Sequence, residues 1–156
     1  PFRCFINPDD PSFELPGNLP KRVQEYCERT GQTVPQTRGE IMRCIYESIA
    51  LKYRYTFQAI REATGKAYET IHMIGGGTKD RLLCQMTADA CNCPVIAGPI
   101  EATAMGNIAV QLIALGEFSG LKEARAVIAN SEQPKSYLPA DPAAYDVAYA
   151  RFQAVQ

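Results

Sequence analysis

The part of the chain best suited to chemistry is a glycine turn, made of three consecutive residues, Gly75, Gly76 and Gly77. Glycine lets a backbone approach a ligand closely and adopt positive φ without a steric penalty. The β-branched run at 70–74 predicts a strand before the turn, and the apolar spacing at 79–91 predicts a helix after it. The first N–H groups of such a helix lack acceptors within it. Thr78 and Asp80 add polar side chains at the same place.

The glycine turn does not match the two common phosphate-binding motifs. The last glycine of a dinucleotide-binding fingerprint would fall at Asp80, and no Gly-Lys-Ser/Thr follows as in a P-loop. Three interpretations remain open from the residues. The backbone could approach a flat group such as a purine, with Thr78 and Asp80 as polar contacts. The turn could bind an anion, although the charge of Asp80 opposes this, or it could be purely structural.

Ordinary catalytic groups are missing from the sequence. There is no Gly-x-Ser-x-Gly motif, and His72 is the one histidine in the chain. We expect His72 to face a core or a neighbouring strand rather than to act as a base. The one adjacent carboxylate pair, Asp9 and Asp10, lies among turn-forming residues. We therefore predict no catalytic residue within this chain.

The six cysteines are expected to be free thiols, at Cys4, Cys27, Cys44, Cys84, Cys91 and Cys93. An even count permits disulfides, but a chain of 156 residues can fold without them, and two of the cysteines fall in helical patterns. The close pair 91 and 93 lacks further metal ligands beside it. We predict buried or incidental thiols in a reducing, cytoplasmic compartment, and no metal site.

Composition limits the remaining classes of function. The 16 basic and 17 acidic residues are well mixed and give a net charge of −1, so no basic patch indicates nucleic-acid binding. No apolar run reaches the roughly 18 residues of a membrane span. The length predicts a single domain over 1–156, with an extended N-terminal segment at 1–20 and a connector at 131–140. Because the chain begins with Pro1, we expect an excised or processed piece.

Helical periodicity predicts the elements that hold the glycine turn. Two strands are expected, at 70–74 and 93–97, and helices at 21–29, 38–64, 79–91, 101–115, 121–129 and from 142 onward, after Asp141 as N-cap. The helix 38–64 carries the strongest apolar stripe, which we expect to face the core or, alternatively, a partner. The stripe consists of Ile41, Ile45, Ile49, Tyr53, Phe57 and Ile60.

The sequence at 71–85 resembles the adenosine-binding segment of the FGGY family of carbohydrate kinases. The segments 88–91, 95–103 and 106–108 resemble the rhamnulokinase subfamily in particular, as do 5–10 and 43–53. The resemblance is collinear and covers most of the chain. It implies an α/β fold: part of an RNase H-like, actin-like ATPase lobe, helix-rich with a small parallel sheet, from the back of the C-terminal lobe.

The resemblance also implies a reaction and a division of labour. The complete enzyme would transfer the γ-phosphoryl group of ATP to a ketose hydroxyl, that of L-rhamnulose, with Mg²⁺ held by residues outside this chain. The Asp-x-Gly-Thr phosphate loop of such kinases is absent here. The N-terminal lobe of the same protein would be the partner, and we expect the fragment alone to be inactive. The alternative is a non-catalytic module for packing or oligomerisation. Because the sheet of such a piece has exposed edges, we expect a homo-oligomer or a strand-exchanged assembly of the isolated chain.

The resemblance assigns the site to the glycine turn. Gly75, Gly76 and Gly77 would lie against the adenosine, and Thr78 takes a position usually filled by a small or hydroxyl residue. Asp80 stands where the family commonly has Asn, which leaves a carboxylate and removes an amide donor. The segment 98–103 would flank the same pocket from the end of the next strand.

Overall fold

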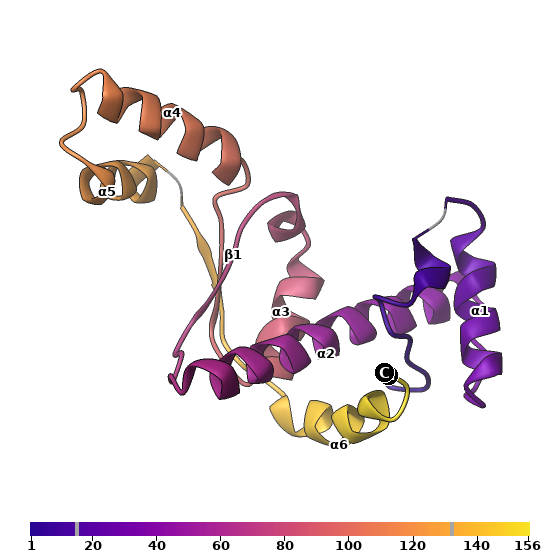
Figure 1. Ribbon diagram of the computed structural model, residues 1–156. Coiled ribbons are helices and arrows are strands. Elements are labelled where there is room, and N and C mark those ends of the chain that lie inside the picture. The colour runs from indigo at the N-terminus through magenta and orange to yellow at the C-terminus, as the bar shows by residue number, and fades with distance from the viewer. Residues whose placement is uncertain (15, 132) are drawn as a thin grey trace.

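The computed structural model describes residues 1–14, 16–131 and 133–156, which fold into helices around a small sheet (Figure 1). The predicted α/β class is confirmed, and the helices are more extensive than the strands. The elements are η1 (Pro11–Phe13), α1 (Leu19–Arg29), α2 (Arg38–Thr64), β1 (Ile71–Met73), η2 (Gly76–Lys79), α3 (Arg81–Cys91), β2 (Val95–Ala97), α4 (Ala102–Ala114), α5 (Leu121–Ser131), β3 (Lys135–Tyr137) and α6 (Pro142–Gln153).

Local capping explains where the longest helix, α2, begins and ends. The Thr37 hydroxyl accepts a hydrogen bond from the Glu40 N–H, and the Glu40 carboxylate accepts one in return from the Thr37 N–H. The helix ends at Gly65, whose φ of 64° is the left-handed conformation that glycine adopts freely. The predicted bounds 38–64 are therefore confirmed. The predicted start of α6 at the Asp141 cap is confirmed as well, with Pro142 as its first residue.

The sheet contains the two predicted strands and one that was not predicted. β1 and β2 are parallel, with His72 opposite Ile96, and β3 pairs antiparallel with β2. The sheet is thus mixed rather than purely parallel, and β3 lies inside the expected connector 131–140, of which Glu132 is outside the described residues. A strand of three residues, Lys-Ser-Tyr, is too short to show an alternating pattern, so its pairing comes from tertiary context.

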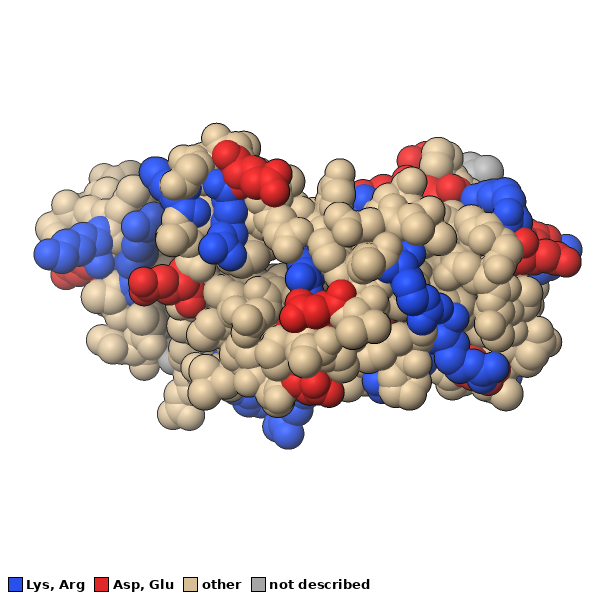
Figure 2. Space-filling view, turned by 90° about the horizontal axis from the view of Figure 1, so that it is seen from below, with Lys and Arg blue, Asp and Glu red and all other residues tan. Residues whose placement is uncertain are grey.

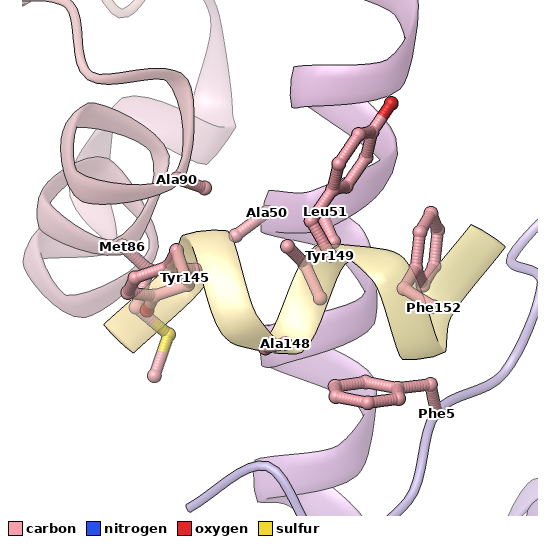
Figure 3. Close-up of a cluster of buried hydrophobic side chains, with 9 residues drawn as sticks. All are labelled: Phe5, Ala50, Leu51, Met86, Ala90, Tyr145, Ala148, Tyr149 and Phe152. Atoms are coloured by element: carbon pink, nitrogen blue, oxygen red, sulfur yellow. The ribbon is translucent and has the colours of Figure 1, made fainter. Parts of the chain in front are cut away.

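The main core forms where α6 packs against α2, α3 and the N-terminal segment (Figure 3). Leu51 of α2 and Phe152 of α6 are fully buried, and burying such a side chain contributes about 1.5–3 kcal/mol before entropy losses. The cluster comprises Phe5, Ala50, Leu51, Met86, Ala90, Tyr145, Ala148, Tyr149 and Phe152. A second cluster joins the N-terminal segment, α1 and the start of α2, and comprises Cys4, Ile6, Val23, Tyr26, Cys27, Ile41 and Cys44.

The buried face of α2 differs from the predicted stripe. Tyr53 and Ile60 are 41% and 46% exposed, so the expectation that the whole stripe faces the core is wrong. The buried face instead carries small and polar residues, including Cys44, Glu47, Ser48 and Ala50. Polar residues are tolerated there because Glu47 accepts a hydrogen bond from the Phe2 N–H at 2.7 Å, and Ser48 accepts one from Ile6 at 2.9 Å.

Helices α4 and α5 pack on each other at the end of the molecule opposite α1 (Figure 1). They bury one alanine each, Ala109 and Ala124, and leave large apolar side chains exposed. These are Ile108, Val110, Leu115, Leu121 and Val127. Among the described residues, no helix combines the length and hydropathy needed to cross a membrane. On the face shown in Figure 2, basic and acidic side chains are interspersed.

Candidate functional site

The glycine turn lies at the carboxyl edge of the parallel strand pair, where two loops are hydrogen-bonded to each other. The Gly75 N–H donates to the Pro99 carbonyl at 3.0 Å, and the Gly98 N–H donates to the Met73 carbonyl at 2.9 Å. The structure therefore brings the loop after β1 and the start of the segment 98–103 together. In open α/β sheets this edge is where ligands bind.

The glycine turn is open on the side of its last two glycines. A Cβ atom added at Gly76 or Gly77 would meet no heavy atom within 4 Å. Gly75 has a φ of +83°, a conformation that other residues rarely adopt, so its conformation alone accounts for glycine there. Packing within the protein gives no reason for glycine at 76 or 77, whereas close contact with a flat ligand would.

Thr78 forms hydrogen bonds within the glycine turn. Its side chain is buried, its hydroxyl donates to the Gly75 carbonyl at 2.7 Å, and its N–H donates to the same carbonyl at 3.1 Å. The hydroxyl is thus bonded within the turn. We infer that Thr78 sets the shape of the glycine turn through these two bonds.

Asp80 anchors the glycine turn to two helices. One carboxylate oxygen caps α3 by accepting the Leu83 N–H at 3.0 Å, and the other accepts the Tyr46 hydroxyl of α2. The hydrogen bonds from the Tyr46 hydroxyl and the Leu83 N–H lower the pKa of Asp80. The same contact raises the pKa of Tyr46. Both oxygens of Asp80 therefore have partners inside the protein, which makes it a positioning residue for the turn.

Two other expectations from the sequence have different outcomes. His72 lies on β1 opposite Ile96 of β2, so the expected neighbouring strand is present, and its side chain is exposed rather than in a core. The prediction of buried free thiols is confirmed for all six cysteines.

Three of these cysteines, Cys4, Cys27 and Cys44, come together in space. Sequence reasoning weighed only the pair 91 and 93 as metal ligands. The first three lie far apart in the sequence, and no spacing pattern could have indicated that they meet.

Comparison with known proteins agrees with this geometry. The profile described as "FGGY family of carbohydrate kinases, C-terminal domain" matches residues 1–115. The chain belongs to this family.

Proteins named rhamnulokinase are similar to this FGGY chain over nearly its whole length. The one from Bacteroides thetaiotaomicron is 46% identical over 153 residues, which is 98% of this chain and 32% of that protein. The one from Bacillus subtilis is 44% identical over 141 residues, 90% of this chain and 29% of that protein. The chain thus spans about a third of the length of the curated relatives it matches.

A solved structure of xylulose kinase from Rhodospirillum rubrum is similar in fold to this chain. It covers 80% of this chain and 25% of its own chain, with a TM-score of 0.58 and 28% identity. The fold predicted from the resemblance, part of a sugar-kinase lobe, is therefore confirmed.

Proposed function

We propose that this chain is the ATP-binding part of an FGGY kinase that transfers the γ-phosphoryl group of ATP to a hydroxyl of L-rhamnulose. The family membership supports a carbohydrate kinase. The identity of 46% with the Bacteroides thetaiotaomicron rhamnulokinase supports the sugar. The single structural observation that carries the proposal is the open face at Gly76 and Gly77 on the carboxyl edge of the sheet.

In this proposal the glycine turn is the wall against which adenosine lies. Gly76 and Gly77 supply the contact surface, because nothing in the protein occupies the space beside them. Gly75, Thr78 and Asp80 hold the wall in shape through the turn, the α3 cap and the bond to Tyr46. The hydrogen bonds of Thr78 and Asp80 restrict the motion of the turn. A preorganised wall lowers the entropy lost when a ligand binds.

The chemical step itself is proposed to depend on residues outside this chain. Phosphoryl transfer relies on positioning and on charge stabilisation by metal and phosphate contacts. We propose that the phosphate loop, the base and the Mg²⁺ ligands belong to the N-terminal lobe of the complete enzyme. This chain, as a single domain over 1–156, would position adenosine and would not turn over alone. A cytoplasmic location is part of the same proposal, and the six free thiols agree with it.

A chimera tests the proposal directly. The chain replaces the matching 153 residues of the Bacteroides thetaiotaomicron rhamnulokinase, and ADP formation is measured with ATP, Mg²⁺ and L-rhamnulose. We expect turnover by the chimera and none by the isolated chain. A folded chimera with no activity on L-rhamnulose would contradict the assignment of sugar and reaction. Turnover by the isolated chain would contradict the proposal that the chemical step needs residues outside it.

The alternative, a module for packing or oligomerisation, is favoured by one observation. Helices α4 and α5 expose large apolar side chains, such as Leu115 at 76% and Leu121 at 60%. Light scattering of the isolated chain tests whether it oligomerises, and we predict an oligomer at high concentration. Titration with ADP distinguishes the two functions, because an oligomer whose glycine-turn amide resonances do not respond to nucleotide would be a structural module.

A further inference from the structure

The strongest unassigned feature of the molecule is the cysteine cluster, which we define as Cys4, Cys27 and Cys44. Cys4 comes from the N-terminal segment, Cys27 from α1 and Cys44 from α2. Their sulfur atoms all lie within 4.8 Å of one another, and each residue is at most 3% exposed. Neither the kinase reaction nor the glycine turn uses these three thiols.

We propose that the cysteine cluster binds one monovalent copper ion, Cu(I), through three thiolates. Thiolates are soft ligands that select Cu(I) and Zn²⁺. Structural Zn²⁺ sites are almost always four-coordinate. Among the described residues, no fourth His, Cys, Asp or Glu joins the group, so a three-coordinate Cu(I) fits this donor set better.

The spacing of the sulfurs suits a single ion between them. Metal–thiolate bonds of about 2.3 Å place three sulfurs roughly 4 Å apart around a central ion. The three sulfurs lie within 4.8 Å of one another, which is compatible with this spacing. Ile6, Val23 and Ile41 belong to the same buried cluster and keep water away from the sulfurs.

Binding also requires the three thiols to lose their protons. Cysteine binds a metal as the thiolate, so loading the cluster releases protons and the affinity should rise with pH.

A cavity gives the ion a way in. It has a volume of about 310 Å³ and is lined by Cys4, Cys44, Arg3 and Arg43, among other residues. The same cavity is lined by Glu40 and Glu47, and each guanidinium is already ion-paired with one of these carboxylates, Arg3 with Glu40 and Arg43 with Glu47. These four side chains therefore add no net charge beside the site. The donor set, the spacing of the sulfurs and an entry path are present.

Anaerobic titration of the reduced chain with Cu(I), in competition with a chromophoric Cu(I) chelator, tests the proposal. We expect one equivalent bound and an affinity that rises with pH, because the thiols lose protons on binding. Cys4→Ser, Cys27→Ser and Cys44→Ser should each lose more than the roughly 10–100-fold that removing a supporting residue costs. The matched control is Cys93→Ser, another buried cysteine outside the cluster, which should bind as the unaltered chain does.

X-ray absorption of the copper-loaded, unaltered chain gives the number of sulfur neighbours of the copper. This measurement does not depend on whether the variants fold. We expect three sulfur neighbours at one distance. Two sulfur neighbours, a stoichiometry of zero, or equal losses of binding in Cys93→Ser and the cluster variants would each overturn the proposal.

Discussion

The glycine turn and the cysteine cluster, which we propose as two ligand sites, are built in opposite ways. The turn is open, uses backbone from residues adjacent in sequence, and leaves space beside Gly76 and Gly77. The cluster is closed, uses side chains from three separate segments, and is buried on all sides but the cavity next to Cys4 and Cys44. An open wall suits a ligand that enters and leaves in each catalytic cycle, and a closed cluster suits an ion that stays.

The two sites also depend on the fold in different ways. The glycine turn is fixed by short-range bonds and by contacts with distant segments, from Gly75 to Pro99 and from Tyr46 to Asp80. The cysteine cluster exists only when the N-terminal segment docks on α1 and α2. Mutations can therefore separate the two sites.

Truncating a side chain of the main core around α6 should destabilise the whole fold, and with it both sites. Phe152→Ala removes a fully buried ring that packs against Phe5, and we expect a loss of about 3–5 kcal/mol in the free energy of unfolding. Chemical denaturation measures it. The control on the same helix, Val147→Ala, is 75% exposed and should stay within about 0.5 kcal/mol of the unaltered chain. Equal effects of the two substitutions would contradict the core assignment.

Loss of the Tyr46 hydroxyl should loosen the glycine turn and spare the cysteine cluster. Tyr46→Phe deletes the hydrogen bond to Asp80 and should cost about 0.5–1.5 kcal/mol in unfolding free energy. In the chimera, the KM for ATP should rise while Cu(I) affinity is unchanged. Tyr53→Phe, at an exposed position of the same helix, is the matched control. A change in Cu(I) affinity in Tyr46→Phe would show that the two sites are coupled.

Acid should weaken the attachment of the turn through Asp80. Because its bonds lower the pKa of Asp80 below the ordinary 3.8, the ionised carboxylate stabilises the folded state above pH 3.8. This contribution disappears as pH falls through the lowered pKa. Thermal melts of the unaltered chain and of Asp80→Asn should therefore differ by a constant amount near neutrality and converge at acidic pH. A difference that does not change with pH would contradict this role of the carboxylate.

Local signals in the sequence were enough to find the glycine turn and most helix bounds. Thr37, Glu40 and Gly65 define α2 by contacts within a few residues, and Asp141 does the same for α6. The features that the sequence did not predict depend on contacts between distant segments. The strand at Lys135–Tyr137, the buried face around Glu47 and the meeting of the three cysteines follow only once the N-terminal segment, α2 and β2 are assembled.

The same difference explains how much of the candidate site was predictable. The position of the turn followed from strand, turn and helix order, and its proximity to Gly98 followed from the family resemblance. The inward bonds of Thr78 and Asp80 did not, because their partners are set by the curvature of the turn and by Tyr46 on a distant helix. Contact of both residues with the ligand stays a prediction, and their bonds within the protein support a positioning role.

The most direct test of the central claim is the KM for ATP of the active chimera carrying Gly76→Ala, compared with Gly39→Ala. A Cβ at either position meets no protein atom within 4 Å, so both variants should keep their melting temperature. If adenosine lies on the glycine turn, Gly76→Ala raises the KM for ATP at least about 10-fold, equivalent to about 1.4 kcal/mol, with the KM for L-rhamnulose unchanged. An unchanged KM for ATP in a folded, active Gly76→Ala chimera would contradict the account.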